Sequence, residues 1–80
     1  MIKTIDDLTA AISTALGAHS QTIDLESGLD MTKGWDSLKN MEIILSVESC
    51  FGVRFTAKEL LTLNSVSSIY SCLQKKGGIA

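Results

Sequence analysis

The stretch GWDSLKNMEIILSVESCFG, residues 34–52, combines the clearest helix signal of the chain with its most unusual polar arrangement. Asp36 is a favoured N-cap residue, the run from Leu38 to Phe51 has helical apolar spacing, and Gly52 suits a helix C-terminus. We therefore expect a helix that starts at Asp36 or Ser37. Unpaired N–H groups and partial positive charge collect at such a start, so a phosphodiester on the Ser37 hydroxyl would be stabilised there.

The same two residues have a simpler interpretation. Asp36 and Ser37 are both ordinary residues for starting a helix. Asp36 has a further option as a ligand that helps to hold a divalent cation. Local chemistry alone therefore leaves a plain helix start and an attachment site as alternatives.

A first helix is predicted before this stretch, and a long loop joins the two. Thr4 and Asp7 form a capping pair, Gly17 suits the helix end, and apolar residues recur between them at spacings of three and four. The helical period disappears over residues 18–34, so we expect a long loop there, pinned by its own apolar residues. These apolar residues are Ile5, Leu8, Ile12 and Leu16 in the helix, and Ile23, Leu25, Leu29 and Met31 in the loop.

Two more helices are predicted after Gly52. Thr56 with Glu59 forms a capping box that opens a short helix through about Leu63, and Asn64 or Ser65 caps the last helix. The residues expected to be buried here are Val53, Phe55, Val66, Ile69, Tyr70 and Leu73. The predicted fold class is all-α: a bundle of three main helices plus one short helix, with a long loop between helices one and two.

Size and composition agree with one small domain. The chain has 80 residues, 45% of them hydrophobic and 20% charged, which is enough for one modest core. We expect a single domain over residues 1–80, with a core of about 2–76 and a short glycine-containing tail. The net charge of −2 lacks the basic excess that nucleic acid binding demands. The longest apolar run, Ile43–Leu45, is far below the roughly 20 residues of a membrane helix, so we expect no membrane partner and a cytoplasmic protein.

No constellation for catalysis or metal binding is visible in the sequence. The only histidine, His19, follows a predicted helix end and is interpreted as a solvated loop residue rather than as a base for Ser37. Cys50 and Cys72 have no CxxC spacing and are interpreted as core thiols of a reducing compartment. Neighbouring carboxylates lack the histidine partners of a transition-metal site. We therefore expect no catalytic and no metal-ligating residues.

The triplet Asp36-Ser37-Leu38 and the positions around it carry a resemblance to a known family. It extends through the loop fragment Ile23 to Leu29 and through Glu42, Ile43, Ile44, Val47, Glu48, Phe51, Gly52, Phe55, Val66 and Ile69. From about Ile2 to Leu73 the chain thus resembles an acyl carrier protein, and the triplet matches the attachment motif of that family.

The resemblance implies that Ser37 carries covalent phosphopantetheine, transferred from coenzyme A by a separate, magnesium-dependent phosphopantetheinyl transferase. The thiol of this arm would hold an acyl or aminoacyl group as a thioester. A loading enzyme would supply that group, and a downstream synthase or transferase would receive it. Asp36 would contact the transferase or a cation, and the protein itself would catalyse nothing. The alternative hypothesis is an unmodified helical protein–protein interaction domain with a carrier-like fold.

Partner contacts are expected on the helix that follows Ser37. At about 100° per residue, Leu38, Met41 and Leu45 form a stripe separate from the core positions of that helix. The stripe is interpreted either as more core or as exposed surface. The resemblance favours partial exposure and places Glu42 at an acidic docking position. Trp35 is interpreted as a loop anchor, with a direct partner contact as the alternative.

The charge pattern departs from that of the fatty acid synthesis carriers that the chain resembles. Those carriers usually show a dense acidic face, whereas Lys39, Arg54 and Lys58 cancel three acidic residues between 37 and 63. The Gly-Trp-Asp-Ser-Leu form looks like discrete carriers of specialised pathways, such as polyketide-type, amino-acyl or surface-polysaccharide assembly. We expect a monomer, because delivery to several enzymes needs free surface. Three residues either line a channel for the acyl chain or close the core: Ile44, Leu60 and Leu61.

Overall fold

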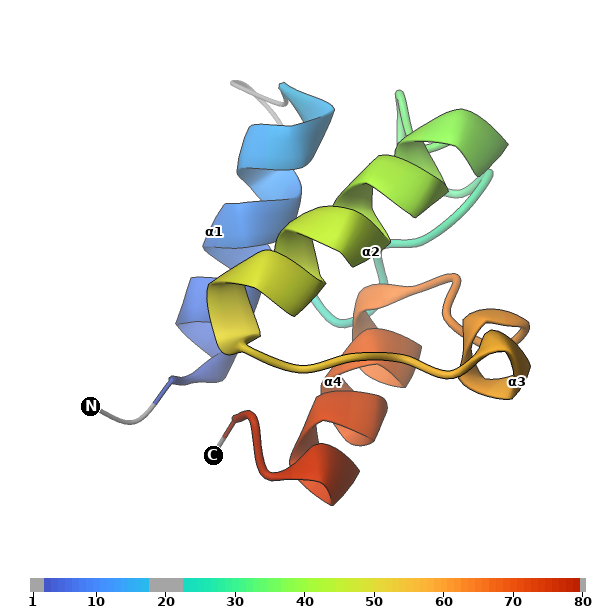
Figure 1. Cartoon of the computed structure of the whole chain (residues 1–80). Helices are drawn as coiled ribbons and strands as arrows, with labels where there is room; N and C mark the ends of the chain where they lie inside the picture. Colours follow the sequence, from blue (N-terminus) through green and yellow to red (C-terminus); the bar gives the residue numbers. More distant parts are fainter. Residues whose placement is uncertain (1–2, 18–22, 80) are drawn as a thin grey trace.

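The computed structural model describes residues 3–17 and 23–79, and it is helical (Figure 1). The helices are α1 (Ile5–Leu16), α2 (Ser37–Phe51), α3 (Ala57–Leu60) and α4 (Val66–Lys76). Within the described ranges there is no strand, only an isolated bridge between Gly28 and Ser65. The predicted all-α fold with three main helices and one short one is confirmed. The short helix ends earlier than expected, at Leu60 rather than near Leu63.

The helix starts use the side chains that the sequence indicated. Asp36 caps α2, and its Oδ1 accepts the Lys39 N–H at 2.9 Å. At α3, the Thr56 hydroxyl accepts the Glu59 N–H, and the Glu59 carboxylate accepts the Thr56 N–H. Ser65 caps α4 in the same way. These bonds satisfy N–H groups that have no partner within the helix, so the helix starts are locally encoded.

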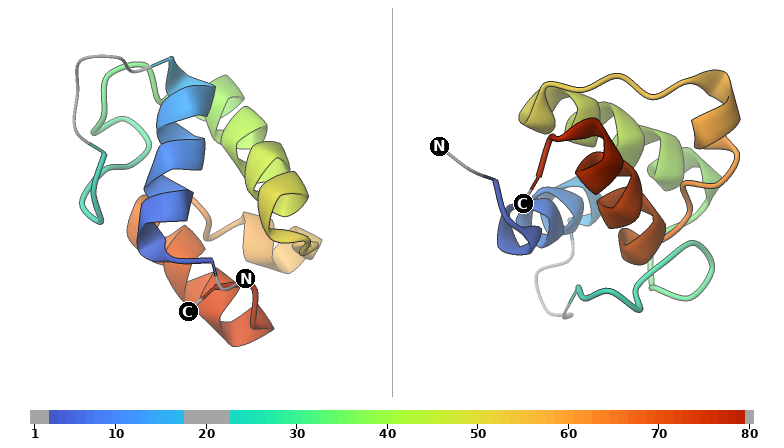
Figure 2. Two further views of the ribbon diagram at one scale, coloured as in Figure 1. Left: turned by 90° about the vertical axis from the view of Figure 1, so that its left-hand side faces the viewer. Right: turned by 90° about the horizontal axis from the view of Figure 1, so that it is seen from below.

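The core lies between the three long helices. Figure 2 shows α1 and α2 side by side and antiparallel, with α4 crossing near their lower ends in the left-hand view. The buried apolar residues are Leu8, Ile12, Trp35, Ile43, Ile44, Val47, Phe51, Phe55, Leu63, Val66, Ile69, Leu73 and Ile79. Each long helix turns one apolar face inward, as its spacing predicted.

The loop before α2 is fixed to the start of α4 by backbone hydrogen bonds. Leu29 N–H donates to the Asn64 carbonyl at 2.8 Å, and Val66 N–H donates to the Ser27 carbonyl at 3.0 Å. The approach is so close that a Cβ at Gly28 would lie 2.9 Å from the Asn64 carbonyl oxygen. Of the loop residues expected to pin it, Ile23 and Leu29 pack against the core, whereas two are exposed: Leu25 (47%) and Met31 (73%). Backbone pairing replaces the missing apolar contacts.

The core continues beyond the expected boundary at Lys76. Ile79 is only 8% exposed and belongs to the core cluster. Gly78 N–H donates to the Leu73 carbonyl at 3.0 Å, and a Cβ at Gly78 would lie 2.8 Å from Val53 Cγ1. The glycine therefore lets the chain turn back closely enough for Ile79 to reach the core.

Of the two expected core thiols, only Cys72 packs against the core cluster. Cys50 is exposed, so its assignment to the core is wrong. Cys50 lines a cleft beside α1, together with Ala10, Ala11 and Thr14. Cys72 is half-buried, and its Sγ lies 3.5 Å from Glu59 Oε2. Burial raises the pKa of the Cys72 thiol, and the Glu59 carboxylate adds to this effect.

Candidate attachment site

Ser37 is the first residue of α2, and its side chain is exposed. Asp36 supplies both cap bonds at this end: its side chain accepts the Lys39 N–H, and its carbonyl accepts the Asn40 N–H at 2.8 Å. No hydrogen bond within the described residues engages the Ser37 hydroxyl. The hydroxyl is thus free to be modified, at the positive end of a helix of 15 residues. This arrangement fits a phosphodiester.

Trp35 anchors the loop immediately before this site. Its side chain is 1% exposed, and its Nε1–H donates to Asn40 Oδ1 at 2.8 Å. Asn40 Nδ2 in turn donates to the Leu63 carbonyl at 2.9 Å. The loop-anchor interpretation is confirmed, and a direct partner contact by Trp35 is wrong, because the indole is buried and its N–H is already bonded.

Asn40 is the functional-site residue that sequence reasoning missed. Its side chain joins the loop before α2, α2 itself and the segment between α3 and α4. The sequence offered one clue to this role: Asn40 has a side-chain amide and lies five positions after Trp35. That spacing does not reveal a partner 23 residues away, so only the tertiary structure identifies the contact.

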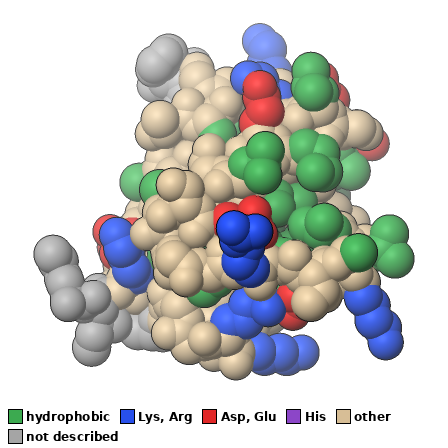
Figure 3. All heavy atoms as spheres, in the orientation of Figure 1, with side chains coloured by type: hydrophobic (Ala, Val, Ile, Leu, Met, Phe, Trp, Pro, Cys, Tyr) green, Lys and Arg blue, Asp and Glu red, His purple; other side chains and the backbone are tan. Residues whose placement is uncertain are grey.

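The stripe along α2 is exposed rather than core. Leu38, Met41 and Leu45 are 72%, 46% and 60% exposed, and Leu61 beside α3 is 84% exposed. Figure 3 shows hydrophobic side chains gathered over α2 and α3. Glu42 is also exposed, and its carboxylate pairs with Lys39 Nζ at 3.0 Å. The site residues expected on α2 therefore share one accessible surface with Ser37.

The acidic groups of the segment from Ser37 to Leu63 all have internal partners. Glu42 pairs with Lys39, and Glu48 Oε2 accepts the Phe55 N–H at 2.8 Å. Glu59 pairs with Lys76 Nζ at 2.8 Å. The hydrogen bond from Lys76, together with the one from the Thr56 backbone, lowers the pKa of Glu59 to about 2.

Two of the three cations of this segment form no ion pair with the part of the chain that the structure describes. Neither Arg54 nor Lys58 forms an ion pair with any described residue. The segment from Ser37 to Leu63 thus has exposed apolar side chains and equal numbers of cations and carboxylates, rather than an acidic excess.

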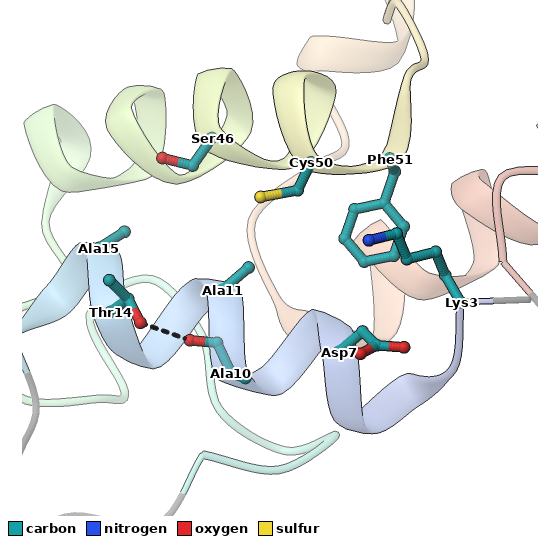
Figure 4. Close-up of a pocket in the computed structure, with 9 residues that line it drawn as sticks. All are labelled: Lys3, Asp7, Ala10, Ala11, Thr14, Ala15, Ser46, Cys50 and Phe51. Atoms are coloured by element: carbon teal, nitrogen blue, oxygen red, sulfur yellow. Dashed lines mark hydrogen bonds between the residues drawn. The ribbon is translucent and has the colours of Figure 1, made fainter. Parts of the chain in front are cut away.

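The residues proposed as a possible acyl channel do not line one space together. Ile44 is 1% exposed and closes the core, whereas Leu61 is 84% exposed. A cleft of about 340 Å³ lies elsewhere, between α1 and α2 (Figure 4). Among the residues that the structure describes, no three His, Cys, Asp or Glu side chains are grouped to hold a metal ion. His19 lies outside the described residues. No helix in the described ranges is long and apolar enough to cross a membrane.

Comparisons with known proteins agree with this geometry. The family model described as "phosphopantetheine attachment site" matches residues 6–73. A solved structure, the holo acyl carrier protein from Geobacter metallireducens, superposes with a TM-score of 0.79 at 29% sequence identity. The match covers 91% of this chain and 84% of that one. A search of curated proteins gives no significant match.

The matched range includes α2 and its N-terminus, and most of the chain superposes on a protein described in its holo form. Domains of this type are not catalytic, and they act as carriers through their covalently attached cofactor. The chain therefore belongs to the phosphopantetheine attachment family, as a carrier protein of the acyl carrier type with covalent phosphopantetheine as its cofactor.

Proposed function

We propose that Ser37 is the residue to which phosphopantetheine is attached. The observation that carries this proposal is the exposed, unbonded hydroxyl at the first position of α2, next to an aspartate that already satisfies the cap. Asp36 then has two roles: it holds the helix start in place, and it contacts the transferase or its cation. When attached, the arm supplies the thiol that carries an acyl or aminoacyl group as a thioester.

The attachment step is a transfer from coenzyme A. Ser37 Oγ forms a bond to phosphorus while the pyrophosphate bond of coenzyme A breaks, and the nucleotide leaves as a bisphosphate. A base on the transferase takes the hydroxyl proton. This chain contributes the exposed oxygen and a rigid helix start. The helix start is rigid because hydrogen bonds of Trp35 and Asp36, the two residues before Ser37, fix the backbone that leads into α2.

We further propose that the exposed stripe of Leu38, Met41 and Leu45, with Glu42 beside it, receives the partner enzymes. These partners are the transferase, a loading enzyme, and a downstream synthase or transferase of a specialised biosynthetic pathway. The exposure of this stripe supports the assignment, and the three cations of residues 37–63 balance its three acids, so the segment has no acidic excess for a basic enzyme surface to bind. The domain limits of 1–80, the monomeric state and the cytoplasmic location remain predictions.

Intact-mass measurement tests the attachment site. The protein is incubated with coenzyme A, magnesium and a permissive phosphopantetheinyl transferase, and Ser37→Ala and Ser49→Ala are treated in parallel. We expect wild type and Ser49→Ala to gain one phosphopantetheine and Ser37→Ala to gain none. Ser37→Ala should keep its helical circular dichroism, because the side chain is exposed and makes no bond.

Two results would count against the proposal. If Ser37→Ala gained the mass of one phosphopantetheine, the arm would be attached to another residue. No gain on wild type, under conditions that modify a known carrier, would favour the unmodified interaction domain, and the exposed stripe on α2 would then be its docking surface.

A further inference from the structure

Lys39 is the cation nearest to Ser37 in the sequence, and its amine has partners on two helices. Its Nζ lies 3.0 Å from Glu42 Oε2, one turn further along α2, and donates to the Ala15 carbonyl of α1 at 3.4 Å. The Lys39 side chain is 39% exposed and the Glu42 side chain 51%. The ion pair is therefore at the surface, with its cation anchored on the neighbouring helix.

The end of α1 explains why the amine is held there. Ala15 lies in the last turn of α1, where carbonyl groups have no N–H partner within the helix and partial negative charge collects. α1 has no basic residue of its own in that turn. Lys39 supplies the cation from α2, so its ammonium group stays beside Glu42 instead of extending into solvent.

Glu42 is the carboxylate of this segment that a partner can reach. Of the three acids in residues 37–63, Glu42 is exposed, whereas Glu48 and Glu59 are half-buried. Both half-buried acids are also bonded to groups outside α2, one to a backbone N–H and the other to a lysine of α4. Any attraction between this segment and a basic partner residue therefore depends chiefly on Glu42.

The pair of Lys39 and Glu42 lies beside the apolar stripe of α2. A depression of about 390 Å³ between α1 and α2 is lined by both residues of the pair, by Leu45 of the stripe, and by Ala15 and Ser46. A partner seated on the stripe therefore meets the carboxylate together with its ammonium partner. Such a pair contributes little to stability, but its cation cancels most of the attraction that the carboxylate exerts on a third charge.

We propose that Lys39 determines partner specificity by shielding Glu42 from enzymes that recognise carriers through basic residues. The inference rests on the proposed function, because it concerns enzymes that approach Ser37 along the stripe of α2. A basic partner residue placed at Glu42 also meets the Lys39 ammonium group and is repelled by it. A partner with an apolar contact surface loses nothing. Lys39 thus acts through Glu42 and takes no part in the chemistry at Ser37.

Removal of the amine, compared with removal of a matched cation, tests this role. Lys39→Gln and Lys58→Gln each remove one positive charge from residues 37–63, but Lys58 is exposed and forms no ion pair with the described residues. The probes are two phosphopantetheinyl transferases, a permissive one and one that binds acidic carriers through a basic surface. The kcat/KM of each for the transfer is measured by intact mass at low and at high ionic strength.

The basic transferase should respond to Lys39 and not to net charge. At low ionic strength we expect Lys39→Gln to raise its kcat/KM by about threefold or more, and Lys58→Gln to raise it by less than about twofold. The gain should disappear at high ionic strength, because salt screens exposed charges. The permissive transferase should change by less than about twofold with either variant. No gain for Lys39→Gln, or an equal gain for Lys58→Gln, would overturn the proposal.

Glu42 variants identify the group through which Lys39 acts. In the double variant Lys39→Gln/Glu42→Gln the gain should vanish, and a gain that persists contradicts the assignment. Glu42→Gln alone covers the case in which Lys39→Gln does not fold. With Lys39 in place, its kcat/KM with the basic transferase should stay within about twofold of wild type, and a larger loss would show that Glu42 is not shielded.

Failure of the proposed function gives a different result. If Ser37 were not the attachment residue, Ser37→Ala would still gain the mass of one phosphopantetheine, whatever the charge at position 39. If Ser37 is the attachment residue but Lys39 has no role in specificity, Ser37→Ala gains nothing, and Lys39→Gln reacts like Lys58→Gln with both transferases.

Discussion

Asn40 shows how one side chain can position an attachment site without taking part in its chemistry. Its amide accepts from the Trp35 indole and donates to the Leu63 carbonyl. Both partners are 1% exposed, so water cannot replace a lost bond without opening the structure. The start of α2 is thereby held against the segment before α4, and Ser37 is presented from a fixed helix end.

Removal of the Asn40 amide should destabilise the fold. In Asn40→Ala the indole N–H and the Leu63 carbonyl remain buried without a partner, so we expect a loss of about 1–3 kcal/mol in the free energy of unfolding. Urea denaturation followed by the fluorescence of the single tryptophan, Trp35, measures this. Ser49→Ala, on an exposed position of the same helix, is the control and should change stability by less than about 0.5 kcal/mol. Equal unfolding free energies of the two variants would show that the hydrogen bonds from Trp35 to Asn40 and from Asn40 to Leu63 contribute nothing to stability.

At the scale of elements, α3 is a single turn that depends on its neighbours. It has four residues and no buried side chain of its own. The Glu59 carboxylate connects it to α4, because one oxygen pairs with Lys76 Nζ and the other lies 3.5 Å from Cys72 Sγ. Lys76 Nζ also lies 5.8 Å from the centre of the Phe55 ring. The position of α3 therefore depends on charge as well as on packing.

The Glu59–Lys76 pair predicts a specific loss of stability in acid. The folded-state pKa of Glu59 is about 2, below its ordinary value of 4.5, so its contribution is complete above pH 4.5 and is lost as the pH falls toward 2. The difference in unfolding free energy between wild type and Glu59→Gln should therefore be constant near neutral pH and shrink below about pH 4.5. Chemical denaturation across this pH range is the measurement. A difference that stays constant down to pH 2 would contradict the assigned pairing.

The segment after α4 acts as part of the core rather than as a tail. Ile79 is 8% exposed, and Gly78 allows the close turn that brings it there. We expect Ile79→Ala to lower the unfolding free energy by about 2 kcal/mol, because it removes buried methyl and methylene groups and leaves a cavity. Lys75→Ala, at an exposed position of α4, is the matched control. Thermal and urea unfolding of both variants would show whether the core ends at Lys76 or at Ile79.

At the scale of the whole molecule, the domain is a small body of 29 × 28 × 19 Å with a distinct carrier face. Ser37, the apolar stripe of α2 and Leu61, the residue after α3, are all exposed. The acids of this face have internal partners, while Arg54 and Lys58 form no ion pair with the described residues. Recognition by a partner should consequently depend on apolar contact more than on charge attraction.

This face predicts a characteristic response of the transferase reaction. Leu45→Asp should lower kcat/KM for phosphopantetheine transfer by about tenfold or more, since it places a charge in an apolar contact. Raising the ionic strength should change the wild-type value by less than about threefold, because residues 37–63 carry three cations and three acids and so have no net charge to be screened. Ser67→Asp, exposed on α4, is the control for added charge. If kcat/KM of the wild type fell strongly with added salt and Leu45→Asp kept its kcat/KM, recognition would depend on charge attraction rather than on apolar contact.

The sequence alone determined the helices, their caps and the carrier class. Local signals suffice for these features: Asp36, Thr56 and Ser65 cap helices through bonds that span three residues. The apolar periods of α1, α2 and α4 likewise predicted the faces that form the core. The Asp-Ser-Leu triplet pointed to the proposed attachment residue, because that motif occupies consecutive positions.

Only the tertiary structure decided which surfaces are free and which distant groups meet. The periodicity of α2 left its second stripe ambiguous, and packing against α1 and the core buried one face of α2 and left Leu38 and Leu45 exposed. The same packing placed Cys50 at the cleft between α1 and α2 rather than in the core. The two hydrogen bonds of the Asn40 side chain, with Trp35 and Leu63, join residues far apart in the chain. Contacts of this kind depend on how the helices pack against one another, a relation that no local spacing of residues encodes.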